Sequence, residues 1–174
     1  MSSTEQVQTV SKALLNLGRI SSVEGPIHSG FLGFYKAQKI VAAKSQMPED
    51  VKYQLTRWKE FCERFIKIAE LEANRDELEN WLIHKKDGNQ IASRTETYVA
   101  VFSLFPKKEE RQDWAPKMRE LCKKTQAVMS GNAGKKDIHD SLSLIENLQR
   151  KVETELTTDK RTTEKIISGR TPLR

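Results

Sequence analysis

The chain has 174 residues and a formal net charge of +6, which allows one domain large enough to bury roughly 70% of its unfolded surface without disulfides or metals. It is 37% apolar and 31% charged, with few glycines and prolines, a composition that argues against a disordered chain and favours a helix-rich protein. The positive charge favours anionic partners: nucleic acid, an anionic membrane surface or an acidic protein.

The sequence also bears on the compartment. The first residues are polar and lack the apolar segment of a signal peptide, and no apolar run approaches the ~20 residues that a bilayer span requires. Cys62 and Cys122 are the two cysteines, too few for a disulfide framework. We therefore expect a cytoplasmic or nuclear protein without a transmembrane segment.

The first predicted elements are a helix, a loop and a second helix. Apolar residues at helical spacing over 7–17 predict the first helix. A Gly-Pro pair and Gly30 follow within residues 19–30, which we expect to form a loop because both residue types break helices. The next helix is expected to run to Lys44.

The start of this second helix, SGFLGFYKAQK, combines three aromatic rings with two lysines. On a helix, Phe31, Phe34 and Tyr35 cluster on one side, and Lys36 and Lys39 lie away from them. This separation favours a helix that packs its rings into the core, whereas a platform for stacking bases would place rings and cations together on the exposed side. The two glycines favour a close approach to another helix.

The middle of the chain predicts three helices. Residues 51–69 carry apolar side chains at alternating spacings of four and three, the pattern of a long amphipathic helix. Asn74 and Glu77 have the spacing of a capping box and open a shorter helix. Residues 97–105 favour a strand by propensity, but no partner strand is evident, so we predict a buried helix over 90–105.

The last third predicts two more helices. Residues 107–113 form a charged link, and Pro116 fits the first position of a helix. Gly131 and Gly134 end that helix. The final helix has an apolar stripe over residues 138–156.

Together these elements predict an all-α fold. We expect a single-domain helical bundle of about six or seven helices over residues 1–158, followed by a basic C-terminal tail over residues 159–174.

The sequence contains no pattern that predicts catalysis. The three histidines, His28, His84 and His139, form no metal-binding pair, and the acids beside His139 fit a helix N-terminus better than a metal site. Residues 131–136 resemble a phosphate loop but lack its spacing, its hydroxyl residue and a preceding strand. We therefore predict no enzyme, no cofactor and no metal.

The basic residues carry the functional hypothesis. They recur in pairs within the links and helices of the second half, where they have the potential to converge on one side. We expect a non-enzymatic protein that binds nucleic acid through phosphate contacts, with RNA favoured over DNA. It would be a subunit of a ribonucleoprotein or virion-like assembly. The candidate contacts are Lys117, Arg119, Lys123, Lys124, Lys135 and Lys136, with Lys160 and Arg161 of the tail in support.

The alternative is a self-associating helical scaffold or matrix-type protein that binds protein partners or an anionic membrane surface. Such a protein would expose an apolar patch instead of a continuous basic one. The basic pairs also fit ordinary solvated helix surface, which sequence alone does not separate from a binding face.

Overall fold

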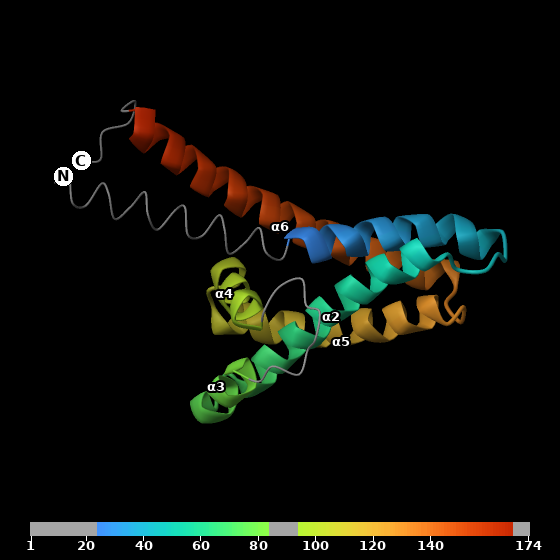
Figure 1. Cartoon of the computed structure of the whole chain (residues 1–174), viewed down its shortest axis with the longest axis horizontal. Helices are drawn as coiled ribbons and strands as arrows, with labels where there is room; N and C mark the ends of the chain where they lie inside the picture. The colour runs from blue at the N-terminus through green and yellow to red at the C-terminus, as the bar shows by residue number, and fades with distance from the viewer. Residues whose placement is uncertain (1–23, 84–93, 169–174) are drawn as a thin grey trace.

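The computed structural model describes residues 24–83 and 94–168, with side chains through residue 155. These residues form six helices and no strand, so the predicted all-α bundle is confirmed. One helix covers residues 24–42 and is followed by α2 (Glu49–Leu71), α3 (Arg75–Ile83), α4 (Arg94–Leu104), α5 (Lys108–Met129) and α6 (Lys135–Ser168) (Figure 1). The helix predicted over residues 7–17 lies outside the described residues.

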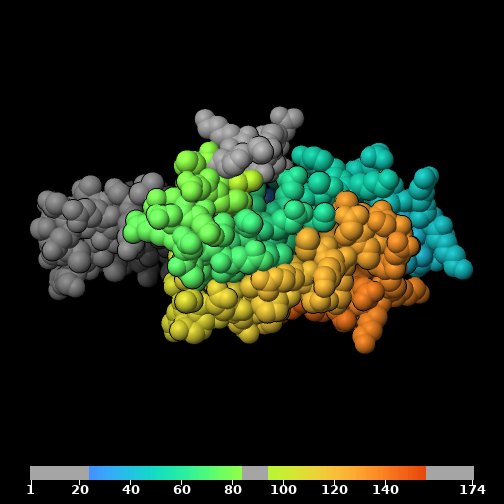
Figure 2. Space-filling model, turned by 90° about the horizontal axis from the view of Figure 1, so that it is seen from below, coloured from blue at the N-terminus to red at the C-terminus, as the bar shows by residue number. Residues whose placement is uncertain are grey.

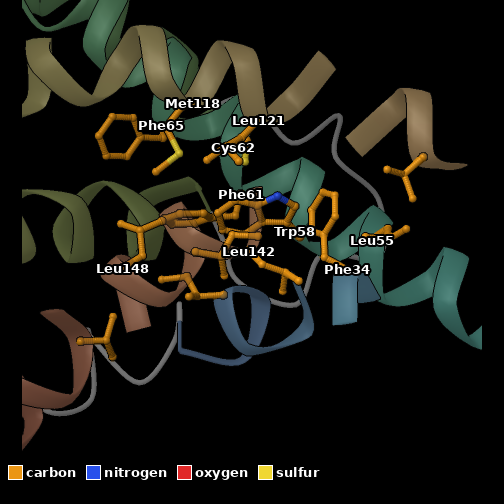
Figure 3. Close-up of a cluster of buried hydrophobic side chains, with 14 of the residues drawn as sticks. Phe34, Leu55, Trp58, Phe61, Cys62, Phe65, Met118, Leu121, Leu142 and Leu148 are labelled. Atoms are coloured by element: carbon orange, nitrogen blue, oxygen red, sulfur yellow. The ribbon is translucent and has the colours of Figure 1, made fainter. Parts of the chain in front are cut away.

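Helix α2 forms the centre of the core. Its apolar stripe is buried along its whole length, as the alternating spacing predicts. Phe61 and Phe65 belong to one buried cluster that also contains Phe34, Met118 and Leu148, which come from three other helices (Figure 3). Phe65 also makes an edge-to-face contact with Phe105, with 5.3 Å between ring centroids. The bundle is therefore organised around one central helix.

The helix over residues 24–42 packs against α2 through two glycines. A Cβ atom on Gly30 would lie 2.6 Å from Cδ2 of Trp58, and one on Gly33 would lie 2.8 Å from Cδ2 of Leu55. These separations are shorter than any real side-chain contact, so the two backbones approach as closely as glycine allows. The predicted close approach is confirmed, and the residues from 24 to 30 are helical, so the loop predicted there is wrong. Gly30, which the sequence predicts as a helix breaker, is a packing residue inside the helix.

The aromatic residues of this helix divide between core and surface. Phe34 is fully buried and Phe31 is partly buried, as expected, but Tyr35 is 50% exposed. The Tyr35 ring stacks on Phe31 with 6.1 Å between centroids, and Nζ of Lys39 lies 5.9 Å from the Tyr35 centroid. The sequence predicts that all three rings face the core, on the side away from the lysines. This prediction is wrong for Tyr35.

Helices α2 and α5 run antiparallel and are joined at one end by a buried ion pair. Nε of Arg111 donates to Oε2 of Glu72 at 2.9 Å, and its Nη2 donates to Oε1 at 3.3 Å. Both side chains are almost fully buried, at 8% and 6% exposure. Nη1 of Arg111 also donates to the carbonyl of Phe105 at 2.7 Å, so the buried guanidinium is paired on several sides.

This ion pair explains why α5 begins earlier than the sequence predicts. The sequence predicts a link over residues 107–113 and a helix that starts at Pro116, but α5 begins at Lys108 and Pro116 lies inside it. A proline inside a helix costs about 3 kcal/mol. Tertiary contacts hold the segment before Pro116 in place. Besides the contacts of Arg111, Ala115 is buried, and Nε2 of Gln112 donates to the carbonyl of Ala69 at 3.1 Å.

The remaining predicted elements are largely confirmed. Helix α3 begins as the capping spacing predicts, with the Glu77 N–H donating to Oδ1 of Asn74 at 3.2 Å. The ambiguous segment is helical as α4, and its buried side includes Thr97, Ala100 and Val101. Helix α6 is continuous to Ser168 and therefore includes the start of the predicted tail. The domain boundary at residue 158 stays a prediction.

The glycine contact gives a direct test of how the first described helix packs. We predict that Gly30→Ala lowers the free energy of unfolding by as much as about 2 kcal/mol, because overpacking a core costs roughly 1–3 kcal/mol and a gain of about 1 kcal/mol in helix propensity offsets part of it. The measurement is urea denaturation. Gly134→Ala is the control, since a Cβ there has no neighbour within 4 Å, and it should cost about 0.5 kcal/mol. Equal losses for both variants would contradict the packing.

Candidate nucleic-acid interface

The predicted cations of α5 lie on two flanks of the helix and are mostly paired with acids. Nη2 of Arg119 lies 3.4 Å from a carboxylate oxygen of Glu70, which places it on the flank beside α2. Lys117 and Lys124 are two turns apart on the other flank. Their stripe also contains Glu110, which contacts Lys151 of α6 at 3.4 Å. The four cations predicted on α5 therefore do not share one face.

Local ion pairs also engage two more of the α5 cations. Nζ of Lys117 lies 3.1 Å from Asp113, and Nζ of Lys123 lies 3.9 Å from Glu120. All of these pairs are exposed, and exposed pairs contribute little to stability. Their carboxylates nevertheless lower the local positive potential that a phosphate would meet.

A second group of lysines has no such pairing. Among the residues that the structure describes, eight lysines have no carboxylate within ion-pair distance: Lys39, Lys67, Lys107, Lys108, Lys44, Lys124, Lys135 and Lys136. The last four lie in or near the segments that join the helix over 24–42 to α2 and α5 to α6, and we call them the loop-end lysines. The other predicted contacts, Lys160 and Arg161, lie where only the helical backbone of α6 is described.

The fold brings the loop-end lysines to one end of the bundle. Two of the acid-free stretches of the sequence, 36–48 and 123–136, contain lysines that the fold brings to this end. The first ends the helix over 24–42 and leads into α2, and the second ends α5 and leads into α6. Both connections lie at the same end of the molecule, where their atoms appear in cyan and orange (Figures 1 and 2). The two connections themselves therefore carry lysine and no acid, while Glu49, Asp50 and Asp137 lie beside them in the first turns of α2 and α6.

The two connections enclose a surface hollow of about 570 Å³. Its lining includes the apolar side chains of Val41, Met47 and Met129, two lysines and the 130–131 turn. No carboxylate of the described residues lines it, although Glu49 approaches Lys52 at 3.6 Å nearby. The lining residues are Val41, Lys44, Ser45, Gln46, Met47, Lys52, Met129, Ser130 and Gly131.

Two other hollows lined by described residues differ in charge. One contains Glu24 and Glu153 beside His28. The other contains Glu72 and Glu79, which are paired with Arg111 and Arg75, together with Lys108. Both would repel an anion at part of their walls. The hollow at the loop end therefore suits an anionic ligand better than either of them.

Helix dipoles do not add to the positive charge of the loop end. The helix over 24–42 and α5 end there, while α2 and α6 begin there. Two negative and two positive helix ends largely cancel. The first-turn acids Glu49 and Asp50 are engaged by Lys52 and Lys36, at 3.6 and 3.7 Å. The lysine side chains therefore determine the potential.

The titratable side chains elsewhere do not form a catalytic arrangement in the described part of the chain. Burial, followed by the nearby charges of Cys122 and Glu63, raises the pKa of Cys62 well above its usual value, and burial also raises the pKa of Cys122. A nucleophilic thiol shows the opposite shift. Nδ1 of His28 lies 3.1 Å from Nε2 of Gln149, and no group of three His, Cys, Asp or Glu residues within 24–83 and 94–155 has the arrangement of a metal site.

Comparisons with known proteins found no relative of this chain. The chain matches no protein-family model, no curated protein and no solved structure. None of the helices that the structure describes is long and apolar enough to cross a bilayer.

Sequence reasoning identified Lys124, Lys135 and Lys136 but missed the contribution of the first half of the chain. Lys44 lies with these lysines only because the start of α2 lies beside the end of α5. The acid-free stretch over 36–48 is a signal that would have pointed to Lys44. Its position beside the second stretch required the tertiary structure.

The raised thiol pKa values predict slow thiol chemistry. Because thiolate is the reacting form, Cys62 in the native protein should react with a thiol reagent at pH 8 at least about tenfold more slowly than in denaturant, with Cys122 reacting first. Since folding raises both pKa values, unfolding releases protons above about pH 9, and the free energy of unfolding should fall as pH rises there. Cys62→Ala should weaken that decline. Rapid native labelling of Cys62 would contradict its burial.

Proposed function

We propose that this chain is a non-enzymatic nucleic-acid-binding protein that holds the phosphates of single-stranded RNA at the loop end of its helical bundle. The observation that carries the proposal is the meeting of two acid-free, lysine-bearing connections at one end of the molecule. Lysine acts as a point charge for phosphate, and each contact releases a condensed counterion. The loop-end lysines have no internal carboxylate in the described part of the chain to displace before they bind.

Tyr35 and Lys39 offer a second kind of contact. The Tyr35 ring is half exposed, and the Lys39 ammonium lies above it. An exposed ring beside a cation is the combination that binds an unstacked base and its phosphate. This pair supports a single strand over a duplex, because the bases of a duplex are already stacked.

The alternative, a self-associating scaffold, has less support. The large exposed apolar side chains among the described residues are Tyr35, Tyr53 and Ile83, on three different helices. A cation lies over each tyrosine ring, with Arg57 6.0 Å from the Tyr53 centroid. Isolated rings covered by cations are not the broad apolar patch that a protein interface requires.

Two charge-matched triple variants test where the phosphates bind. K44Q/K135Q/K136Q removes three loop-end lysines, and K117Q/R119Q/K123Q removes three α5 cations that are paired with acids. We predict that the first variant weakens binding to a fluorescent oligouridylate by at least tenfold at about 50 mM salt, measured by anisotropy. The second should weaken it by less than about threefold, since both lose equal net charge but only the first loses unpaired cations.

The control separates position from net charge. Equal losses in the two variants would mean that binding depends on total charge and that the loop end is not a site. Circular dichroism of both variants should be unchanged, because all six side chains lie at the surface.

A further inference from the structure

We infer that the hollow at the loop end is a single-nucleotide pocket: it takes one unstacked nucleotide of the bound strand, with its phosphate on Lys44 and its base against Val41, Met47 and Met129. This inference rests on the proposed function and specifies the contact that makes it. The argument depends on the backbone at Lys44, on the lining of the pocket and on its size.

The backbone at Lys44 is unusual for a lysine. Its φ is 52°, in the left-handed region that costs a residue with a Cβ about 1–2 kcal/mol. Lys44 follows the end of the helix over 24–42, where the Ser45 N–H donates to the carbonyl of Ile40 at 3.0 Å and the Lys44 N–H donates to that of Val41 at 3.1 Å. This is a helix C-cap in which glycine is the favoured residue at the position of Lys44.

The same cap is repeated across the pocket with glycine in that position. Gly131 has a φ of 77°, the Asn132 N–H donates to the carbonyl of Ala127 at 2.8 Å, and the Gly131 N–H donates to that of Val128 at 3.1 Å. Both caps line the same pocket. The cap at Gly131 is therefore unstrained, and the cap at Lys44 is the strained form of the same motif. This difference indicates that the Lys44 side chain has a use beyond ending the helix.

The lining of the pocket fits the two chemically different parts of a nucleotide. Val41, Met47 and Met129 are partly buried hydrophobic residues at the edge of the core. Methionine adapts its shape and polarises easily, so two methionines can cover the face of any base. Lys44 and Lys52 supply positive charge, and the turn at Ser130 adds polar groups for the sugar.

The size of the pocket is also appropriate. A volume of about 570 Å³ lies within the range of small-ligand sites, roughly 300–1,000 Å³. A single nucleotide fills such a space, whereas a duplex presents no free base to enter it. The absence of carboxylates from the described lining removes the repulsion that a phosphate would meet in the hollows beside Glu24 or Glu72.

Methionine methyl groups provide a probe inside the pocket. The chain has four methionines; Met47 and Met129 line the pocket, and Met118 is fully buried elsewhere in the core. With 13C-methyl methionine, we predict that uridine monophosphate and a short oligouridylate both shift the Met47 and Met129 signals and leave Met118 unchanged. Met47→Leu and Met129→Leu assign the signals.

Lys44→Gly separates function from stability. Glycine relieves the left-handed backbone, so the midpoint of thermal unfolding should rise by about 2–4 °C. The same variant loses one phosphate contact, so the slope of log K against log salt should fall by about 0.7, and the affinity for oligouridylate should fall at least threefold. Lys44→Arg keeps the charge and should retain the wild-type slope and the methionine shifts.

The outcomes distinguish this inference from the proposed function. Oligouridylate that binds with steep salt dependence but leaves Met47 and Met129 unshifted would overturn the pocket and leave the loop-end lysines as an open phosphate surface. An unchanged affinity and an unchanged salt slope in K44G would place the phosphate on another cation and also overturn the assignment. No binding of oligouridylate at low salt would overturn both.

Discussion

The antiparallel alignment of α2 and α5 is the constraint on which the rest of the structure depends. At one end, Arg111 and Glu72 form a buried, doubly hydrogen-bonded pair that places the start of α5 beside the end of α2. An unpaired partner would leave a buried charge, so this register is strongly preferred over a shifted one. The opposite end follows from it: the start of α2 must lie beside the end of α5, and the connections at 43–48 and 130–134 must meet. The packing of the core thereby creates the hollow that we propose as a binding site.

The division between a neutral core and a charged end also has a physical origin. Nearly all of the buried side chains of α2 are apolar, and several charged groups along its flanks form ion pairs, such as Lys59 with Glu63 and Glu70 with Arg119. Connections between helices carry fewer packing constraints, and the two at the loop end contain lysine, glycine and small polar residues without acids. A basic protein with interspersed acids can therefore have one region of unbalanced charge, even though its net charge of +6 is modest.

Much of the fold follows from the sequence, because local patterns determine it. The apolar stripe of α2, the cap at Asn74 and the helical nature of α4 were all predictable from spacing and from the need to satisfy backbone hydrogen bonds. The errors at Gly30 and Pro116 have a common cause: both residues break isolated helices, and both are tolerated here because tertiary contacts hold the chain around them. The candidate site was predictable only in part, since Lys135 and Lys136 stand out in the sequence whereas the partnership of Lys44 with Gly131 depends on how the helices pack.

A salt titration of wild-type protein, freed of nucleic acid, against fluorescent single-stranded RNA tests the proposed phosphate binding most directly. The four loop-end lysines predict that log K falls against log salt with a slope near −3, at roughly 0.7 per contact. Binding at micromolar concentration or tighter with that slope would support phosphate neutralisation at the loop end. The absence of binding at low salt, or binding that does not change with salt, would contradict it and would make the lysines ordinary solvated surface.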